Sequence, residues 1–432
     1  MEGDRYRRGC GCISICDNGG NFIISMKKNC FNACEILLPS GNDYKSWSCI
    51  ACDQFTSEVK YWQDLEKAVA GKKSVLNLIF PEVYLEDNKA ERISKINANI
   101  EEYIKDGAFK SLKKGLILTV RKTPYVERRI GIIGAIDLDS YEYAPKSKAL
   151  VRSTEGVVEE RIPPRLEIRK NAKVEFPHVM MLYDDEKKEI AEELYKNKDR
   201  LEKLYDFELN MGGGSIEGYF IEDYQPILDK FSKLLDEDRV VAKYGSYDNF
   251  LFAVGDGNHS LATAKAHWEA VKKTIPESEW ETCPAKYALV EANNIYDDGI
   301  YFEPIYRHVS GVNAKDFTDY ILKVSGDFGV ISDGVKEKKD GVSLPQSILN
   351  VDNAIKEYII SNGGKVDYIH GLSNLNDLIS ADKNSVGITF DKLDKKQLFN
   401  YVSNTGAFPR KTFSMGEGVE KRYYLEGRLI RK

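Results

Sequence analysis

Short apolar runs alternate with amphipathic stretches from about residue 46 onward. Apolar runs predict strands at residues 48–51, 75–80, 115–120 and 130–136. Helical spacing predicts helices at 61–70, 89–106 and 187–205; in the second, Ile93, Ile96 and Ile100 recur at steps of three and four residues. This alternation is typical of α/β architecture, so we expect a mixed α/β (α+β) fold.

Two segments are predicted to interrupt this pattern. Pro163 and Pro164 lie in segment 161–165 and are expected to break regular structure there. Three adjacent glycines at 212–214 predict a turn or loop, because they offer no side chain to pack. A connecting turn is the simpler interpretation of this loop, and a cover over a ligand is the alternative.

The pattern also predicts a division into domains. Gly, Lys and Asp accumulate without apolar periodicity at 333–344, so we expect a boundary near Ser310 and a smaller C-terminal α/β domain at 311–432. Residues 26–310 are expected to form the α/β catalytic region. Residues 1–25 are rich in Gly, Asn and Cys, so we expect an unstructured tail there, with Met26 as the functional start.

Composition narrows the class of protein. The 432 residues include 62 Lys and Arg against 68 Asp and Glu, for a net charge of −6, with 42% hydrophobic and 30% charged residues. This profile is typical of a globular protein, and its dispersed lysines argue against a nucleic-acid partner. No run approaches the ~18 apolar residues of a membrane span and no leader-like apolar segment begins the chain, so we expect a cytoplasmic protein without membrane contact. The oligomeric state stays open, with a homo-oligomer as one option.

The cysteines cluster near the start of the chain. Seven of the eight lie within the first 52 residues: Cys10, Cys12, Cys16, Cys30, Cys34, Cys49 and Cys52. A disulfide framework would be spread through the fold that it connects. Cys10, Cys12 and Cys16 could hold a metal, but their spacing is not a usual zinc spacing and no His is near. Free thiols are the simpler interpretation.

A strand, a glycine turn and a helix follow one another at residues 249–268. The apolar run 250–254 leads into Gly255-Asp256-Gly257, and a helical repeat follows at Leu261, Ala264 and Trp268. A helix that begins at a glycine turn presents unpaired N–H groups and the positive end of its dipole, which together suit a phosphate.

The polar residues of this turn have two interpretations. Asp256 could hold Mg²⁺, while Asn258 and His259 could donate hydrogen bonds to phosphate oxygens. Alternatively, Asn258 or Ser260 only caps the helix, and Gly257 supplies a left-handed turn. Two other phosphate motifs are missing from the sequence: Glu66 stands where a Walker loop ending at 71–74 needs glycine, and no G-x-G-x-x-G follows a strand.

Three further groups of polar residues are candidates for binding. After the strand at 48–51, a small polar substrate could be held by Asp53, Gln54, Thr56 and Ser57, unless Thr56 or Ser57 only caps the next helix. Arginine forks suit phosphate, and Arg152, Arg161 and Arg165 lie close together in the sequence, although surface ion pairs are the simpler role. His178 is more simply a core or capping histidine than a substrate ligand.

Several of these motifs together resemble the domain of unknown function 1015 family. They are Cys-Asp-Gln-Phe-Thr-Ser at 52–57, Thr-Glu-Gly at 154–156, Ile-Pro-Pro-Arg at 162–165, Pro-His at 177–178, Gly-Asp-Gly-Asn-His-Ser-Leu-Ala-Thr-Ala at 255–264, Arg-Lys-Thr-Phe-Ser-Met at 410–415 and Lys-Arg-Tyr-Tyr at 421–424. The likeness covers roughly residues 26–431. That family looks related to the ParB/sulfiredoxin superfamily and to free serine kinases, which implies a ParB/sulfiredoxin-like nucleotide-binding core with additional N-terminal and C-terminal elements.

The resemblance can be followed residue by residue at the helix start. Asp256, Gly257 and His259 match the turn of the kinases. Asn258 stands where the kinases have their first His and sulfiredoxin its catalytic Cys, so sulfiredoxin chemistry is excluded. Ser260 replaces the Arg of the motif, a loss for which Arg152, Arg161 or Arg165 could compensate.

The function implied by this resemblance is a nucleotide-dependent small-molecule kinase, with free L-serine or a similar hydroxyl compound as acceptor. ATP or ADP would donate the phosphoryl group with Mg²⁺. Gly255, Gly257, Asn258 and Ser260 would bind the nucleotide, Asp256 would support the metal and His259 would contact the phosphate. By analogy with an acidic residue of the kinases, Glu155 would accept the hydroxyl proton. Asp53 and Thr56 would orient the acceptor. The alternative is a non-catalytic nucleotide-binding module like the ParB clamp, which the net acidic charge disfavours.

Overall fold

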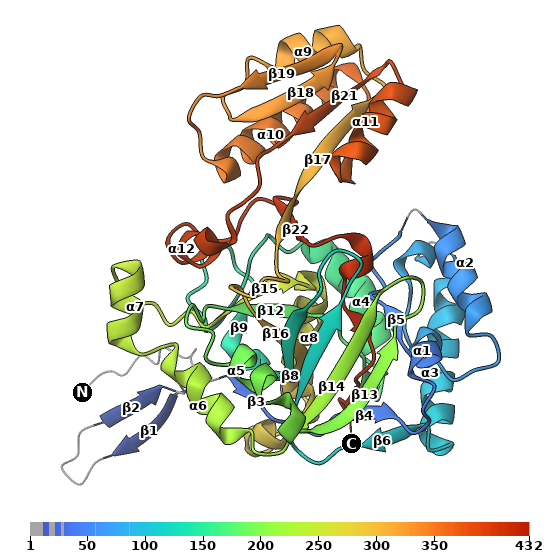
Figure 1. Cartoon of the computed structure of the whole chain (residues 1–432), viewed down its shortest axis with the longest axis vertical. Coiled ribbons are helices and arrows are strands. Elements are labelled where there is room, and N and C mark those ends of the chain that lie inside the picture. Colours follow the sequence, from blue (N-terminus) through green and yellow to red (C-terminus); the bar gives the residue numbers. More distant parts are fainter. Residues whose placement is uncertain (1–11, 17–21, 27–29, 57, 86, 432) are drawn as a thin grey trace. The chain divides into compact units, whose positions relative to one another are not determined.

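The chain folds into two compact units. The computed structural model describes residues 12–16, 22–26, 30–56, 58–85 and 87–431 (Figure 1). The first unit contains the described residues up to 153, then 157–299 and those from 419 onward, and the second contains 154–156 and 300–418. The expected boundary near Ser310 falls at the end of a strand, β17 (Phe302–Ser310). The C-terminal residues rejoin the first unit because β23 (Tyr423–Tyr424) pairs with β5 (Cys49–Ile50).

A large mixed sheet forms the centre of the first unit, as the predicted mixed α/β fold requires. Among the described residues it has ten strands, in the order β13 (Glu202–Glu208), β14 (Ser215–Ile221), β7 (Leu116–Lys122), β8 (Arg129–Asp137), β16 (Tyr287–Asn294), β12 (Met180–Tyr183), β15 (Phe252–Asp256), β10 (Val151–Ser153) and β9 (Tyr141–Glu142), with β3 (Phe31–Asn32) beside β8. Every residue of β8 is buried, which explains its continuous apolar run.

The helices of the first unit are short except for two. They are α1 (Tyr44–Trp47), α2 (Val59–Ala68), α3 (Lys89–Lys105), α4 (Ile162–Arg169), α5 (Ala191–Lys196), α6 (Gln225–Lys233), α7 (Glu237–Tyr244) and α8 (Asn258–Lys272). The predicted helical repeat of α8 is confirmed, because Leu261, Ala264 and Trp268 are all buried in one core with residues of β8, β12 and β15. This packing holds the start of α8 at the end of β15.

The second unit has its own antiparallel sheet. Its strands run in the order β19 (Gly334–Lys338), β18 (Phe328–Ser332), β21 (Ser385–Thr389), β17 and β20 (Lys365–His370), and β22 (Phe413–Met415) also pairs with β17. Its helices are α9 (Ala314–Ile321), α10 (Leu344–Asn362), α11 (Leu372–Ala381) and α12 (Leu398–Asn404). A separate apolar core lies between these elements, with Phe317, Phe328 and Ile348 fully buried.

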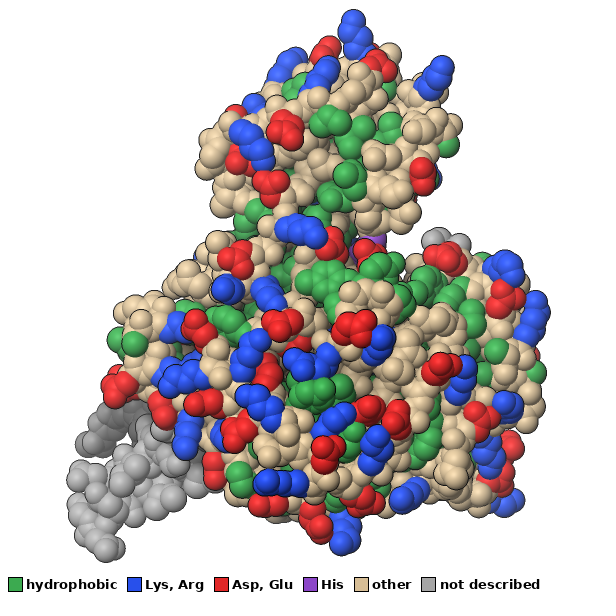
Figure 2. Space-filling model, viewed as in Figure 1, with side chains coloured by type: hydrophobic (Ala, Val, Ile, Leu, Met, Phe, Trp, Pro, Cys, Tyr) green, Lys and Arg blue, Asp and Glu red, His purple; other side chains and the backbone are tan. Residues whose placement is uncertain are grey.

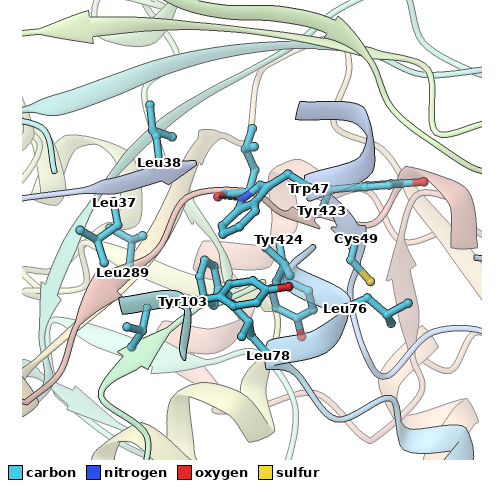
Figure 3. Packing of buried hydrophobic residues seen from close by; sticks show 14 of the residues in the cluster. Leu37, Leu38, Trp47, Cys49, Leu76, Leu78, Tyr103, Leu289, Tyr423 and Tyr424 are labelled. Atoms are coloured by element: carbon cyan, nitrogen blue, oxygen red, sulfur yellow. Dashed lines mark hydrogen bonds between the residues drawn. The ribbon is translucent and has the colours of Figure 1, made fainter. Parts of the chain in front are cut away.

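A second core of the first unit holds its C-terminal segment in place. Figure 3 shows Tyr423 and Tyr424 among Trp47, Leu78 and Tyr103, and all belong to one buried cluster. The indole N–H of Trp47 donates to the carbonyl oxygen of Leu425 at 3.0 Å. Two further strand pairs belong to this unit: β4 (Leu37–Pro39) with β6 (Phe109–Ser111), and β11 (Val174–Glu175) with β24 (Arg428–Leu429). The second pair involves the C-terminal segment.

Three predicted elements differ in the structure. The apolar run at 75–80 forms a 3₁₀ helix at Val75–Leu78, capped by the hydroxyl of Ser74, which accepts the Leu76 N–H. The helix predicted at 187–205 is limited to α5, because its last residues enter β13 and pair with β14. Pro163 and Pro164 do not break regular structure: they lie in the first turn of α4, where no N–H donor is needed.

The predicted unstructured tail contains two strands, β1 (Cys12–Cys16) and β2 (Phe22–Met26), which pair in antiparallel fashion. Cys10 and the other residues of 1–11 and 17–21 lie outside the described part of the chain. Within the described residues, no helix is long and apolar enough to cross a membrane. On the face shown in Figure 2, positive and negative side chains are interspersed, so their fields largely cancel there.

Candidate functional site

The turn between β15 and α8 requires glycine. Asp256 pairs with Met180 while Val254 pairs with Met181, so Gly255 is the extra residue of a β-bulge. Gly257 follows with φ +80°, and a Cβ added there would lie 3.0 Å from the Cα of Val179. Both observations exclude a larger residue at this position, so the left-handed turn expected at Gly257 is confirmed.

The start of α8 has no side-chain cap. Gly257 occupies the N-cap position, so neither Asn258 nor Ser260 caps the helix in the way that the simpler interpretation expected. The N–H groups of a first helical turn have no partners within the helix, and the dipole is positive there. The side-chain oxygen of Asn258 is also buried without a hydrogen-bond partner. A ligand with an anionic group could accept hydrogen bonds from the N–H groups of the first turn, and a donor on the same ligand could bond to the Asn258 oxygen.

Lys421 brings a positive charge to this turn. Its ammonium lies 3.1 Å from the carboxylate of Asp256, and both side chains are largely buried. The other oxygen of Asp256 accepts the Gly257 N–H at 2.9 Å. Lys421 therefore supplies a cation beside the first turn of α8.

The same ion pair bears on the expected Mg²⁺ ligand. Asp256 already has an ammonium partner, and a cation bound to its carboxylate would be repelled by Lys421. Within the described residues, no group of three His, Cys, Asp or Glu side chains could hold a metal. The arrangement does not fit Mg²⁺ on Asp256, so we derive no step through a metal.

His259 is oriented by the backbone. Its Nε2 accepts the N–H of Val158 at 3.1 Å. Acceptance at Nε2 requires a lone pair there, so a neutral ring carries its proton on Nδ1. His259 is the second residue of α8, so its ring is fixed at the start of the helix.

A second polar group is centred on His178. The Nε2 of His178 lies 3.5 Å from Asp53 Oδ2 and 3.4 Å from the hydroxyl of Ser260. Its Nδ1 lies 2.7 Å from the hydroxyl of Tyr424, which donates to the sulfur of Cys52 at 3.0 Å. Gln54 holds the other oxygen of Asp53 with a hydrogen bond of 3.0 Å. Because Ser260 belongs to the first turn of α8, this group adjoins the candidate phosphate site.

Charges in this group shift the titration of its members. Burial opposes the charge on Asp53, but His178, Gln54 and Lys421 together lower the pKa of its carboxyl. Burial also opposes the charge on His178, yet Asp53, Asp256 and Glu82 raise the pKa of its imidazole. The two shifts therefore favour the charged forms of Asp53 and His178 over their neutral forms.

Two of the three candidate arginines already have carboxylate partners. Arg152 is buried and binds Asp248 with two hydrogen bonds, of 2.8 and 2.5 Å. Arg165 forms an ion pair with Glu82 and donates to the carbonyl oxygen of Arg161 at 2.8 Å. The side chain of Arg161 is exposed. Lys421 takes the place that we expected one of these arginines to take.

The other candidate residues divide between the two units. Glu155 belongs to the second unit, where its carboxylate accepts the Lys411 N–H at 3.1 Å. Thr56 is exposed, and Ser57 lies outside the described residues. Of the predicted substrate-binding residues, the structure brings together Asp53, Gln54 and His178.

Sequence reasoning assigned no role to Lys421, Tyr424, Cys52 or Glu82. The Lys-Arg-Tyr-Tyr motif at 421–424 was a usable signal, because it combines a cation and a phenol in a short segment near the C-terminal end of the sequence. The sequence contains no sign that this segment returns to the first unit.

Comparisons with known proteins place the chain in a family. Residues 37–403 match the model described as "Protein of unknown function (DUF1015)", so the chain belongs to this family. No curated protein matches the sequence significantly. Three similar solved structures have low scores. A free serine kinase in complex with AMP is 8% identical, with a TM-score of 0.37, over 69% of this chain and 90% of the kinase.

The second is a conserved hypothetical protein from Pyrococcus furiosus, 10% identical with a TM-score of 0.33, over 69% of this chain and 92% of the other. The third is SbnI with a C-terminal truncation from Staphylococcus aureus, 9% identical with a TM-score of 0.35, over 66% and 82% of the two chains.

Proposed function

We propose that this member of the DUF1015 family is a nucleotide-dependent kinase that phosphorylates the hydroxyl group of a small molecule, with free L-serine as the first acceptor to test. ATP or ADP would be the donor. In this proposal, β15, its bulge and α8 form the nucleotide-binding part of a ParB/sulfiredoxin-like core. The protein would act in the cytoplasm.

One observation carries the proposal: two groups meet at Ser260. The first is the start of α8, which has no side-chain cap and has the buried Lys421 beside it. The second is the pair of Asp53 and His178, because the ring of His178 contacts the hydroxyl of Ser260. The first part suits the phosphates of a nucleotide, because it offers N–H donors, the helix dipole and an ammonium group. The second part offers a carboxylate held in a fixed orientation. Phosphoryl transfer requires little more than such positioning and charge stabilisation.

The transfer is written for ATP as donor. The acceptor oxygen forms a bond to the γ-phosphorus, and the bond from that phosphorus to the bridging oxygen of ADP breaks. ADP leaves with the bonding electrons, and the hydroxyl proton passes to a carboxylate. With ADP as donor, the same exchange takes place at the β-phosphorus and AMP leaves. Lys421 would stabilise negative charge on the phosphoryl oxygens, and His259 is the residue that the family resemblance suggests for a second phosphate contact.

Two carboxylates are candidates for the base. Glu155 is the choice by family analogy, and its place in the second unit leaves its distance to the turn undefined. Asp53 belongs to the first unit, its neighbours keep it ionised as a base requires, and it lies beside His178, which contacts Ser260 of the first turn of α8. We therefore assign the base to Asp53 and keep Glu155 as the competing assignment.

The test is to incubate the pure protein with ATP or ADP, with and without Mg²⁺, and a panel of amino acids and alcohols, and to detect phosphorylated product by mass spectrometry. Asp53→Asn should lower turnover by about 10²- to 10⁴-fold and leave nucleotide affinity nearly unchanged. Glu155→Gln is the matched variant. If only Glu155→Gln loses turnover, the base is Glu155; if nucleotide binds but no acceptor is phosphorylated, the protein is a binding module.

A further inference from the structure

An apolar cavity lies directly behind the polar group of His178. Its volume is about 170 Å³, and apolar side chains form most of its wall, with contributions from α3, α4, α8 and the 75–80 segment. Ile96 and Ile100 of α3, Ile168 of α4 and Leu261 of α8 are among them. A cavity of roughly 150 Å³ with such a lining is large enough for a benzene ring. This one is therefore large enough for an aromatic ring or a branched aliphatic group.

Polar side chains line the rest of the same cavity. Cys52, His178, Ser260 and Tyr424 take part in its wall, together with the ion pair of Arg165 and Glu82. Two of these residues connect the cavity to the candidate site. His178 contacts Asp53, and Ser260 belongs to the first turn of α8. A ligand with an apolar body in this cavity would therefore place a polar end beside the candidate phosphate site.

The wall also contains small side chains that leave the space open. Ala172, Ala264 and Ala288 all line the cavity and are buried. An unfilled apolar cavity lowers stability, and larger side chains at such positions would fill it. An apolar cavity with a few convergent polar groups and perturbed pKa values is typical of a ligand site.

We infer that the cavity binds the apolar body of the acceptor, and that the acceptor is an alcohol with an aromatic or branched aliphatic group. This inference rests on the proposed function for the transfer itself. Serine has no group that would fill the cavity, so it would bind at the polar end alone. The alcohol oxygen would lie at the end formed by His178 and Ser260, facing the nucleotide phosphates, and its proton would pass to Asp53.

The test compares benzyl alcohol with methanol and L-serine. Benzyl alcohol should raise the melting temperature of the wild-type protein without nucleotide, and methanol at the same concentration should not. With nucleotide present, benzyl phosphate should form with a KM at least about tenfold below that for L-serine, as expected when burial of a ring adds more than 1.4 kcal/mol.

Two variants fill the cavity from different sides, Ala264→Leu on α8 and Ala172→Leu after α4. Each should abolish the melting shift with benzyl alcohol and keep the wild-type nucleotide affinity, which also shows that the variant is folded. If one does not fold, the other decides. Ile100→Ala enlarges the cavity and should shift preference toward bulkier alcohols.

The two proposals fail in different ways. A melting shift that is lost in the filled variants, without nucleotide binding, would support the cavity as an apolar ligand site and contradict the kinase. Nucleotide binding with no shift from benzyl alcohol, or a shift that the filled variants retain, would overturn the inference about the acceptor and leave the kinase standing.

Discussion

The ammonium of Lys421 lies 3.1 Å from the carboxylate of Asp256, which places a residue from the C-terminal segment beside the turn that begins α8. The pair connects two segments far apart in the sequence. It also gives the helix start a positive charge beside the N–H groups of its first turn, and this is the feature on which nucleotide binding depends in our proposal.

Removal of this charge should weaken nucleotide binding. Lys421→Ala is expected to raise the dissociation constant for ATP or ADP by about 10- to 100-fold, because hydrogen bonds to charged groups contribute about 1.5–3 kcal/mol. Lys421→Arg should retain most of the affinity. Titration calorimetry with and without EDTA measures both effects. Lys113→Ala, which removes an exposed lysine, is the control, and an equal loss in that variant would contradict the prediction.

The turn at Gly257 should not tolerate a side chain. Gly257→Ala combines a positive φ with a Cβ 3.0 Å from the Val179 backbone, so we expect a loss of about 1–3 kcal/mol in the free energy of unfolding and a loss of nucleotide binding. Gly245→Ala is the matched control, because that residue has φ +81° and no atom within 4 Å of the added Cβ. Urea unfolding and nucleotide titration of both variants check this. Unchanged nucleotide affinity in Gly257→Ala would show that the turn does not bind phosphate.

The pair of His178 and Asp53 predicts a loss of stability as the pH rises above about 6.5. The pKa of His178 is raised in the folded protein, so its contribution is fully present below the unfolded value of about 6.5 and is lost as the pH rises through the folded pKa. Urea unfolding across this range should show a decline that His178→Asn removes. His308→Asn is the control, since burial lowers the pKa of that histidine and gives no alkaline loss. If the free energy of unfolding declines in the same way in His178→Asn, another titrating group causes the decline and the prediction is wrong.

A different histidine predicts a loss of stability at acidic pH. Burial, with Arg169 and Arg431 nearby, lowers the pKa of His267 to about 4. Its folded pKa lies below the unfolded value, so its neutral form is favoured and stability falls as the pH falls from about 6.5 to about 4, by about 3 kcal/mol in total. His267→Asn should flatten this part of the stability profile. An unchanged slope in that variant would show that His267 titrates normally in the folded protein.

Local patterns in the sequence predicted a large part of the fold. The strands predicted at 115–120 and 130–136 correspond to β7 and β8, and the helices predicted at 61–70 and 89–106 correspond to α2 and α3. The helical repeat predicted after the glycine turn corresponds to α8. These elements have clear apolar periodicity or runs, and the turn at Gly257 has a glycine that its backbone requires. The failures arose where the pattern permits two structures. The run at 75–80 is too short to separate a strand from a buried 3₁₀ helix.

The candidate site depended on contacts that no local pattern contains. The sequence by itself determined the glycine turn and the polar residues after β5, because backbone conformation and side-chain chemistry act over a few residues. That neither Asn258 nor Ser260 caps α8 became clear only in the structure. Tertiary structure alone decided that Lys421 reaches Asp256 and that Tyr424 reaches His178. It also decided that apolar residues of α3, α4 and α8 enclose a cavity beside them. The physical reason is that burial of apolar faces, which is not directional, determines which distant segments meet, and the partner of each buried charge follows from that packing.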